Sequence, residues 1–355
     1  MQVATMQSAA RAQRLGAAVR RGKQARRQVV VQAASDTKFA DYQPKVAFFF
    51  PGQGAQTVGM GKEVAEAVPA ARQLFDRASD ILGYDLLAVC AEGPKDKLDS
   101  TAVSQPAIYV ASLAALEKLR AEQGEEAAAA ADVCCGLSLG EYTALTYAGA
   151  ISFDDGLRLV KLRGESMQAA ADAQPSGMVS VIGLSADKVA ELCEAASQEA
   201  PQGQGVRIAN FLCNGNYAVS GGIAGCEAVE RLAKGFKARM TVRLAVAGAF
   251  HTDFMAPARE QLQQALAGTT IQEPRIPVIS NVDAAPHSDP DTIKKILAQQ
   301  LTAPVQWETS VKTLLDSGLE RSYEIGPNKA GRLRGVIAGI MKRIDKKHSI
   351  ENITV

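Results

Sequence analysis

Histidine is scarce in this chain of 355 residues, and C-x-x-C cysteine pairs and long apolar runs are absent. The three histidines, His251, His287 and His348, are far apart, so the sequence has no metal-ligand spacing. None of the six cysteines forms a C-x-x-C pair. We expect the cysteines to be free thiols that pack as small buried hydrophobic residues in a reducing compartment. The absence of any run of about 18 apolar residues excludes a membrane-spanning helix. The sequence therefore predicts a protein without a metal site or a membrane span.

Acidic residues are absent from residues 1–35, which contain seven Arg and Lys residues and many alanines. The rest of the chain has 32 basic and 38 acidic residues, although the net charge of the whole is +1. An Arg-rich, acid-free leader without a long apolar centre is typical of an organelle transit peptide, with processing expected near residues 31–34. The alternative is a disordered basic tail that binds nucleic acid. The transit interpretation predicts the plastid stroma, with the mitochondrial matrix as the alternative.

Hydrophobic residues make up 47% and charged residues 22% of the chain, which is typical of a soluble globular protein. The length favours one large domain with an insertion, or two domains. The continuous apolar run Val46–Phe50 fits a buried parallel strand, and Pro51 and two glycines then force an irregular loop that carries Gln53. Helical patterns follow at residues 62–82 and 105–123. These patterns indicate the α/β class.

Residues 177–243 differ in character from the sequence on either side. Their patterns follow the order strand, helix, strand, strand, helix, strand, which is the order of a ferredoxin-like unit. The strands are expected at 178–182, 206–210, 217–220 and 240–244, and the helices at 186–200 and 225–235. We therefore predict a ferredoxin-like small domain at 177–243, inserted into a catalytic core formed by residues 45–175 and 245–340.

The chain returns to α/β character after this insertion. Strands are expected at 276–280 and 323–325, and a helix at 291–301. A last helix should follow Gly331. Residues 341–355 are predicted to be a charged and frayed C-terminal tail.

The sequence around Ser138 combines a short apolar run, a glycine-rich turn and a helical pattern. Residues 133–135 predict the end of a buried strand, and Gly136-x-Ser138-x-Gly140 precedes the helix. This is the strand, nucleophile elbow and helix arrangement, in which a side chain at either glycine would collide with strand or helix. The unpaired N–H groups and positive end of the helix could hold an oxyanion beside Ser138. The alternative is a glycine-rich turn with an incidental serine.

A serine nucleophile needs a general base, because an unassisted hydroxyl is a poor nucleophile at neutral pH. His251 follows a predicted strand beside a glycine, whereas His287 lies in a polar, Pro-rich turn and His348 in the charged tail. By elimination His251 is the predicted base, and the alternative is a core or cap histidine. The acceptor that orients its imidazole is either Asp253, poorly placed two residues away, or a backbone carbonyl.

Five motifs occur in an order that points to one family. They are FFFPGQGAQ at 48–56, GLSLGEY at 136–142, LRG at 162–164, GAFH at 248–251 and PVQW at 304–307. The chain from about residue 45 to 340 resembles the malonyl-CoA:acyl-carrier-protein transacylases of type II fatty acid synthesis. This resemblance implies an α/β-hydrolase-like core with a ferredoxin-like insert.

The resemblance also implies a role for each matching residue. Ser138 would be the nucleophile and His251 the base. Gln53 and the backbone N–H of Leu139 would form the oxyanion hole. The carbonyl of Gln300 would orient His251.

Arg163 would bind the malonyl carboxylate, and the chemistry of the side chain agrees with this implied role. Malonyl differs from acetyl by one carboxylate, which a planar guanidinium can hold with two parallel hydrogen bonds. The alternative is a surface arginine in an ordinary salt bridge. Phe250 resembles the malonyl-selective form of its motif and would crowd an α-methyl branch. Leu137 stands where the family often has histidine, a difference that leaves the mechanism intact but bears on loop packing.

These features predict a two-step thioester exchange. Ser138 attacks malonyl-CoA, CoA leaves, and the phosphopantetheine thiol of acyl carrier protein takes the malonyl group. No cofactor and no nucleic acid is implied, and we expect a monomer. A serine hydrolase with the same elbow would not need Arg163, and a noncatalytic scaffold would be expected to lose Ser138 or His251. The basic residues that would dock an acidic carrier, or form a merely solvated face, are Lys234, Lys237 and Arg239.

Overall fold

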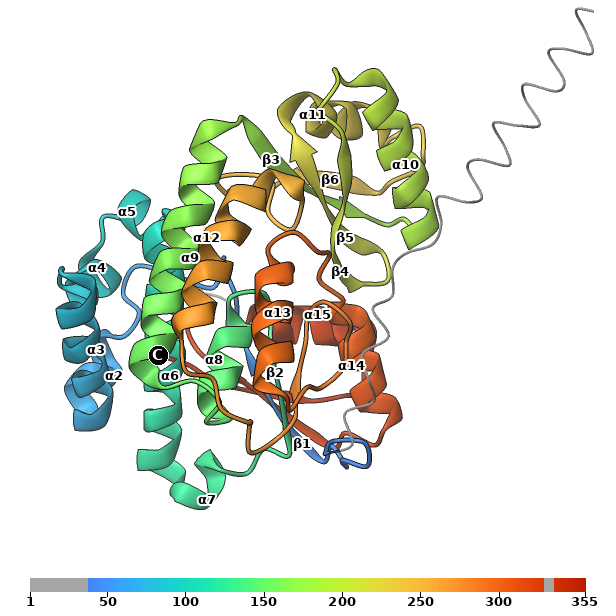
Figure 1. Cartoon of the computed structure of the whole chain (residues 1–355). Helices are drawn as coiled ribbons and strands as arrows, with labels where there is room; N and C mark the ends of the chain where they lie inside the picture. Colours follow the sequence, from blue (N-terminus) through green and yellow to red (C-terminus); the bar gives the residue numbers. More distant parts are fainter. Residues whose placement is uncertain (1–37, 329–334) are drawn as a thin grey trace, which may run out of the picture. The chain divides into compact units, whose positions relative to one another are not determined.

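The computed structural model describes residues 38–328 and 335–355, all of which belong to one compact unit, Asp36–Val355. The predicted transit peptide, residues 1–35, lies outside the described residues. Two separate β-sheets organise the described chain, one of five strands and one of four (Figure 1). This is the mixed α/β fold that the sequence predicts.

The five-stranded sheet is parallel and has the strand order β7-β2-β1-β8-β9. Its strands are β1 (Val46–Phe50), β2 (Val133–Gly136), β7 (Val278–Ile279), β8 (Arg321–Ile325) and β9 (Ile350–Ile353). In the central strand β1, Phe48 and Phe50 pack into one hydrophobic cluster, whereas Ala47 and Phe49 pack into another. Successive side chains of a strand point to opposite faces, so this apolar run buries both faces of the sheet.

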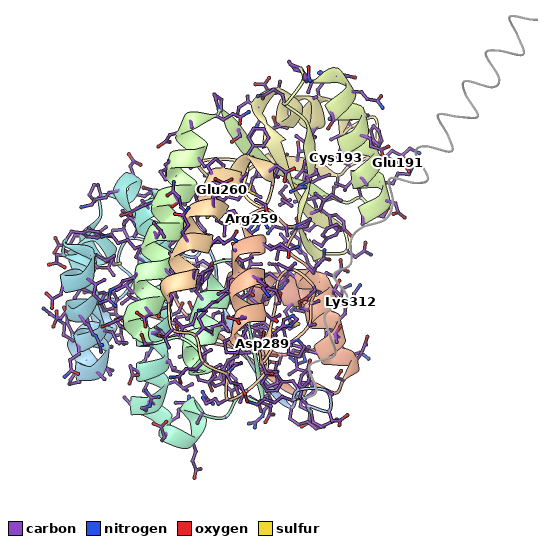
Figure 2. The ribbon with its side chains drawn as sticks, in the orientation of Figure 1. Glu191, Cys193, Arg259, Glu260, Asp289 and Lys312 are labelled. Carbon is purple, nitrogen blue, oxygen red and sulfur yellow. The ribbon has the colours of Figure 1, made fainter. Side chains whose placement is uncertain are left out.

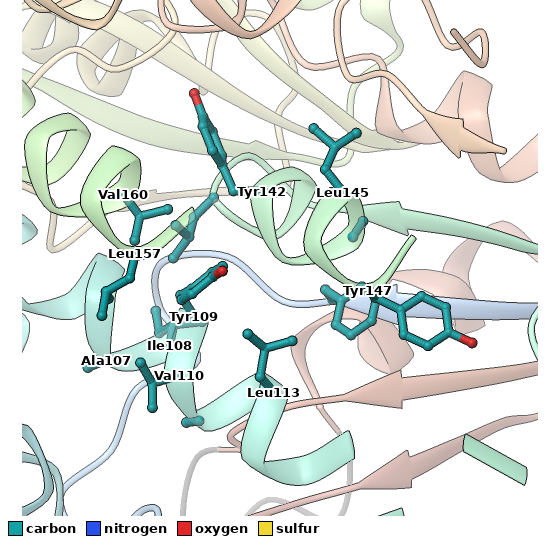
Figure 3. Packing of buried hydrophobic residues seen from close by; sticks show 14 of the residues in the cluster. Ala107, Ile108, Tyr109, Val110, Leu113, Tyr142, Leu145, Tyr147, Leu157 and Val160 are labelled. Carbon is teal, nitrogen blue, oxygen red and sulfur yellow. The ribbon is translucent and has the colours of Figure 1, made fainter. Parts of the chain in front are cut away.

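Helices surround this sheet (Figure 1). They are α2 (Lys62–Ala67), α3 (Pro69–Leu82), α4 (Leu86–Glu92), α5 (Lys95–Asp99), α6 (Thr101–Gln123), α7 (Glu125–Ala128), α8 (Gly140–Tyr147), α9 (Phe153–Ala173), α12 (Ala256–Gly268), α13 (Pro290–Gln300), α14 (Trp307–Asp316) and α15 (Val336–Ile344), with the short 3-10 helix η1 (Asp253–Met255). Figure 3 shows Ile108 and Tyr109 of α6 packed near Tyr142 of α8 and Val160 of α9. This packing holds the helices that carry the candidate site.

Capping side chains determine where two of these helices begin. The Ser152 hydroxyl accepts a hydrogen bond from the Asp155 N–H at 3.1 Å, and α9 starts at Phe153. Asp289, labelled in Figure 2, accepts from the Thr292 N–H at 2.7 Å and starts α13. The two helices end up carrying Arg163 and Gln300, respectively.

The four-stranded sheet has the order β4-β5-β3-β6, and all of its strand pairs are antiparallel. Its elements are β3 (Ser176–Ile182), α10 (Ala186–Glu199), β4 (Val206–Cys213), β5 (Asn216–Gly222), α11 (Ile223–Leu232) and β6 (Met240–Arg243). Val179, Val219 and Leu192 belong to a hydrophobic cluster of this region's own. The element order predicted for residues 177–243 is therefore present, with β3 starting at Ser176 and β4 three residues longer than predicted.

The expectation of a frayed tail from residue 341 onward is wrong. Helix α15 continues to Ile344, and β9 then pairs with β8 in parallel register, with Ile353 opposite Ile325. Charged residues at 342–347 hide this strand in the sequence, but Ile353 is 7% exposed and packs into the main core. The sequence patterns also left α12 and α14 unassigned.

Candidate active site

Ser138 follows β2 at the carboxyl edge of the parallel sheet and has a φ of 53°, in the left-handed region. The turn is possible because of its glycines. A Cβ on Gly136 would lie 1.8 Å from the Gly140 carbonyl carbon, and one on Gly140 would lie 2.1 Å from the Phe50 oxygen. The collisions expected with helix and strand are therefore present. Backbone strain of this kind is often found at nucleophiles that must project from a turn.

His251 meets Ser138 although 113 residues separate them in the chain. Its Nε2 is 3.0 Å from the Ser138 Oγ, and its Nδ1 is 2.8 Å from the carbonyl oxygen of Gln300. The carbonyl can only accept, so Nδ1 carries the proton and Nε2 is left to accept the serine hydrogen. His251 also has a left-handed φ of 59°. The structure thus brings the predicted nucleophile and base together.

The environment of His251 keeps its imidazole neutral. The pKa of His251 is lowered to about 4, chiefly by burial and also by the nearby positive charge of Arg163, while the hydrogen bond to the Gln300 carbonyl opposes the shift. The side chain is only 3% exposed. A neutral imidazole is the form that can take a proton from a hydroxyl at physiological pH.

Asp253, His287 and His348, the other residues considered as the orienting acceptor or the base, form no hydrogen bond with Ser138 or the His251 ring in the described structure. Asp253 is exposed and lies 3.7 Å from Arg207, so it does not orient the imidazole. His287 bonds the Asp283 carboxylate at 2.9 Å, and the His348 ring bonds the Ser322 hydroxyl at 2.7 Å. The backbone-carbonyl alternative is therefore the one that the geometry supports.

Arg163 is buried in the middle of α9, with an exposure of 1%, and is not a surface arginine. One Nη2 hydrogen bond reaches the Ser138 Oγ at 3.0 Å, and another reaches the Gln300 Oε1 at 2.9 Å. Nη1 donates to the Gln105 Oε1 at 2.6 Å, and the guanidinium lies 5.5 Å from the Tyr142 ring centre. Burial lowers the pKa of Arg163, with Tyr142 opposing the effect.

The partners of Arg163 within the described chain are neutral groups rather than a carboxylate. Its Nε is buried and makes no hydrogen bond within residues 38–328 and 335–355, where no ion pair reaches the guanidinium either. A buried cation with unused hydrogen-bonding capacity is costly unless an anion joins it. The guanidinium beside Ser138 is therefore well suited to bind a carboxylate.

Gln300, the last residue of α13, is fully buried and contacts His251, Arg163, Ser138 and Glu141. Its carbonyl accepts from His251 and its side-chain oxygen accepts from Arg163. Its Nε2 donates to the Ser138 carbonyl at 3.0 Å and to the Glu141 Oε2 at 2.7 Å. The sequence predicts a role for the backbone carbonyl of Gln300 alone. The structure adds three hydrogen bonds of its side chain.

Two further buried side chains, Glu141 and Asn281, escaped the sequence analysis. Asn281 Oδ1 accepts from the Ser138 N–H at 2.6 Å, and Nδ2 donates to the Gly136 carbonyl at 2.7 Å. The Glu141 Oε2 accepts from the Asn281 N–H at 3.1 Å. Asn281 directly follows the predicted strand 276–280, and polar residues at the carboxyl ends of parallel strands converge. The position of Asn281 directly after a predicted strand was therefore the sequence feature that could have indicated a site residue.

The two residues expected to form the oxyanion hole flank the elbow. Leu139 precedes α8, and Gln53 follows β1 in a loop where a Cβ on Gly52 would lie 2.2 Å from the Leu137 oxygen. Within the described residues, no hydrogen bond from the N–H of Gln53 or of Leu139 is present. The Gln53 side-chain amide instead donates to the Thr101 Oγ1 at 3.4 Å. The two backbone N–H groups remain the donors that an oxyanion could use.

Phe250 and Leu137 are both buried, but in different places. Phe250 is 5% exposed, packs in the main core, and its carbonyl accepts from the Ser220 hydroxyl at 2.8 Å. Leu137 packs with Trp307 and Val305 in the smaller cluster on the other side of the sheet. An apolar residue therefore fits the position where the resembling family often has histidine.

Three other features of the described chain were compared with this site: a surface hollow, clusters of possible metal ligands, and helices that could cross a membrane. A surface hollow of about 720 Å³ at α2, α3 and α4 is lined by none of the predicted site residues. Across residues 38–328 and 335–355, no group of three or more His, Cys, Asp or Glu side chains is arranged for a metal ion. Of the helices in this part of the chain, none is both long and apolar enough to cross a bilayer.

Comparison with known proteins agrees with this geometry. The acyl transferase domain family matches residues 47–330. The malonyl CoA-acyl carrier protein transacylase of Bacillus subtilis is 38% identical over 303 residues, covering 85% of this chain and 91% of the relative. The mitochondrial transacylase of Homo sapiens is 41% identical over 302 residues, covering 81% and 75%.

Solved structures give the same result. The malonyl CoA-acyl carrier protein transacylase of Coxiella burnetii superposes with a TM-score of 0.81 at 34% identity, covering 88% of this chain and 95% of the other. A malonyl-transacylase in complex with a type II PKS acyl-carrier protein superposes with a TM-score of 0.80 at 35% identity, covering 87% and 95%. The resemblance of the five motifs is thereby confirmed, and the chain belongs to the malonyl-CoA–acyl carrier protein transacylases of the acyl transferase domain family.

Proposed function

We propose that this protein transfers the malonyl group from malonyl-CoA to the phosphopantetheine thiol of acyl carrier protein through a malonyl-Ser138 intermediate. The observation that carries this proposal is the buried guanidinium of Arg163, which lies 3.0 Å from the Ser138 Oγ without a carboxylate partner. An esterase acting on neutral acyl groups has no use for such a cation. Membership of the transacylase family supplies the reaction and the acceptor.

In the first half-reaction, the Ser138 Oγ attacks the thioester carbonyl carbon while His251 Nε2 takes the hydroxyl proton. The negative charge that develops on the carbonyl oxygen is held by the N–H groups of Gln53 and Leu139. The C–S bond then breaks, and His251 returns the proton to the leaving CoA sulfur. The product is an ester between malonyl and Ser138.

The second half-reaction reverses these steps with another thiol. His251 takes the proton of the phosphopantetheine thiol, the sulfur attacks the ester carbonyl, and the C–O bond to Ser138 breaks. The proton returns to the serine oxygen, so the enzyme is regenerated without a cofactor. Because His251 and Gln300 are 3% and 0% exposed, this site is well suited to limiting hydrolysis by water.

Arg163 and Phe250 are proposed to determine which acyl group is accepted. The malonyl carboxylate would replace the serine hydroxyl as an acceptor of Arg163 N–H groups and would supply the missing negative charge. Phe250, the residue before His251, would disfavour a branched α-carbon by its bulk. Selection therefore depends on one attractive and one repulsive element.

The finer features of the fold belong to the same proposal. The strand order β4-β5-β3-β6 and the alternation of strands and helices support a ferredoxin-like insert. The parallel sheet with an elbow after β2 supports an α/β-hydrolase-like core. The proposed insert is residues 177–243, and the proposed core is residues 45–175 with 245–340, extended to β9 (Ile350–Ile353) because that strand pairs with β8.

We further propose that the chain is directed to an organelle by residues 1–35 and acts there as a monomer. The acid-free, Arg-rich composition supports a transit peptide, with the plastid stroma as the proposed location. The three relatives from Mus musculus, Homo sapiens and Drosophila melanogaster carry "mitochondrial" in their names, which keeps the mitochondrial matrix as the alternative.

The experiment that tests the function follows labelled malonyl-CoA and acetyl-CoA onto the protein and then onto carrier protein. Wild type should form an acyl-enzyme and pass malonyl to the carrier. Arg163→Ala should reduce malonyl transfer by at least about 10-fold, which corresponds to about 1.4 kcal/mol, with a much smaller effect on acetyl transfer. Arg163→Lys should recover part of the ratio, since it restores charge but not the two-pronged geometry.

Ser138→Ala is the matched control, because it should abolish the acyl-enzyme with either substrate. Malonylation of another residue in Ser138→Ala would contradict the assigned nucleophile. An unchanged malonyl-to-acetyl ratio in Arg163→Ala would show that the carboxylate is bound elsewhere. Release of free malonate without transfer to the carrier would favour a hydrolase.

A further inference from the structure

The orientation of the Gln300 carboxamide is determined by its neighbours. On one side lies the Arg163 guanidinium, which can only donate, at 2.9 Å from Oε1. On the other side lie the Ser138 carbonyl and the Glu141 carboxylate, which accept from Nε2 at 3.0 and 2.7 Å. A carboxamide turned by 180° would place its NH2 group against the donors of Arg163.

Glu141 is itself held in place by backbone. Its Oε2 accepts from the Asn281 N–H at 3.1 Å, and Asn281 in turn bonds both sides of the elbow around Ser138. The side chain is 3% exposed, whereas acidic side chains are seldom buried. Within the described structure, the Glu141 carboxylate contacts neither the Ser138 Oγ nor His251. Any effect of Glu141 on the reaction must therefore pass through the residues that it does contact, Gln300 and Asn281.

We propose that Glu141 is a specificity-determining positioning residue, which acts on malonyl selection by fixing the Gln300 carboxamide so that its oxygen faces Arg163. The inference rests on the proposed malonyl transfer. The connection runs from the Glu141 Oε2 through Gln300 Nε2 and Oε1 to Arg163 Nη2. Without the acceptor at Glu141, Gln300 loses one of the two acceptors that hold its NH2 group away from the guanidinium.

The reaction of acetyl groups provides an internal reference. Acetyl has no carboxylate, so its transfer does not need Arg163 in one orientation. A loss of Glu141 that acts through Gln300 should therefore change the ratio of malonyl to acetyl transfer. A general loosening of the elbow should slow both substrates alike.

The test compares Glu141→Met with Glu141→Gln in the full-length protein. Glu141→Met removes the acceptor at similar length and should lower the malonyl-to-acetyl ratio about 10-fold. In Glu141→Gln, the amide oxygen can accept from both Asn281 and Gln300, because both donors converge on one oxygen, so the ratio should stay within about threefold of wild type. This conservative variant separates the hydrogen-bonding role from mere filling of space.

A double-mutant cycle shows whether the effect passes through Arg163. In an Arg163→Ala background, Glu141→Met should leave the ratio unchanged. The matched control is Glu324→Met, since Glu324 is also buried and accepts from the N–H groups of Ile337 and Ala338 at 3.0 and 2.8 Å, at the start of α15. It should lower stability without changing the ratio.

Three results would overturn the inference: an unchanged ratio in Glu141→Met, equal losses for malonyl and acetyl, or a full effect of Glu141→Met in the Arg163→Ala background. If Glu141→Met does not fold, Gln300→Met removes the carboxamide directly, and an unchanged ratio there overturns the inference as well. Failure of the proposed function looks different, because wild type would then transfer no malonyl or Arg163→Ala would leave the ratio unaltered.

Discussion

Three residues of the site carry charge states that their surroundings determine. His251 is kept neutral by burial and by Arg163, and Arg163 is buried among neutral hydrogen-bond acceptors. Burial raises the pKa of Glu141 to about 7, while hydrogen bonds from Gln300 and Asn281 oppose the shift. The nearby Asp283 also raises this pKa and His287 lowers it. Each of these shifts is a cost to stability at some pH, and we interpret the cost as a consequence of function.

The lowered pKa of His251 predicts a pH-dependent stability. Because the folded-state pKa of about 4 lies below the ordinary value of 6.5, the unfolded chain binds the proton more strongly. The contribution of His251 is therefore fully present above pH 6.5 and is lost as the pH falls towards 4. By pH 5, the loss relative to a variant without the imidazole should be about 2 kcal/mol.

The comparison uses His251→Asn, because asparagine tolerates the left-handed backbone at this position. Urea unfolding of both proteins at pH 7.5 and pH 5.0 gives the difference in the free energy of unfolding. Wild type should lose more stability than the variant between these values. Equal losses would show that the imidazole is not protected from protonation.

Among the secondary-structure elements, the turn between β2 and α8 depends on close contact between neighbouring backbone segments. The loop after β1, the turn after β2 and the start of α8 approach one another within distances that leave no room for a side chain at Gly136 or Gly140. Ser138 is held at its left-handed φ by this contact and by Asn281. The positions of the proposed oxyanion donors and of the proposed nucleophile are thus coupled.

Gly140→Ala tests this coupling. Its Cβ would meet the Phe50 oxygen at 2.1 Å, so the backbone must shift, and we expect a loss of at least about 2 kcal/mol in stability together with slower acylation. The matched control is Gly339→Ala in α15, where a Cβ meets nothing within 4 Å. There the substitution should stabilise the protein by about 0.5–1 kcal/mol. Chemical denaturation and acyl-enzyme formation measure both effects, and a tolerated Gly140→Ala would contradict the close-contact account.

At the scale of the whole molecule, the C-terminal strand completes the parallel sheet. The Gly326 N–H donates to the Ile353 carbonyl, and Lys118 of α6 donates to the Thr354 carbonyl at 2.9 Å. The Gly335 N–H donates to the Asn352 side chain at 3.0 Å. Residues 352–354 therefore link β8, α6 and the start of α15, so the C-terminal strand is a structural part of the sheet.

Ile353→Ala should lower the free energy of unfolding by about 2 kcal/mol or more, because it leaves a cavity beside Ile325 in the core. Glu351→Ala, an exposed position of the same strand, should change it by less than about 0.5 kcal/mol. Thermal and urea unfolding of the two variants provide the comparison. Equal effects would mean that β9 contributes no packed side chain to the core.

Features that depend on local pattern and on rare residues could be predicted from the amino-acid sequence. The apolar run at β1, the glycine-flanked serine and the alternating elements of residues 177–243 follow from periodicity and steric limits, which act over short distances. With three histidines in the chain, elimination was enough to select His251, whose ring lies 3.0 Å from the Ser138 Oγ. The order of five motifs was enough to identify the family.

Which distant groups meet depends on how the chain folds and could not be predicted from local pattern. Neither the GLSLGEY motif, which contains Glu141, nor the position of Asn281 after a strand shows that the two residues meet. Their contacts join α8, the segment after β7 and α13, which the folding of the sheet brings together. The acceptor that orients His251 is likewise a backbone carbonyl rather than Asp253 because the fold brings α13 beside the ring, and α13 supplies that carbonyl from 49 residues away. The strand at 350–353 was missed for the same reason: a short edge strand among charged residues is specified by the neighbour it pairs with, not by its own sequence.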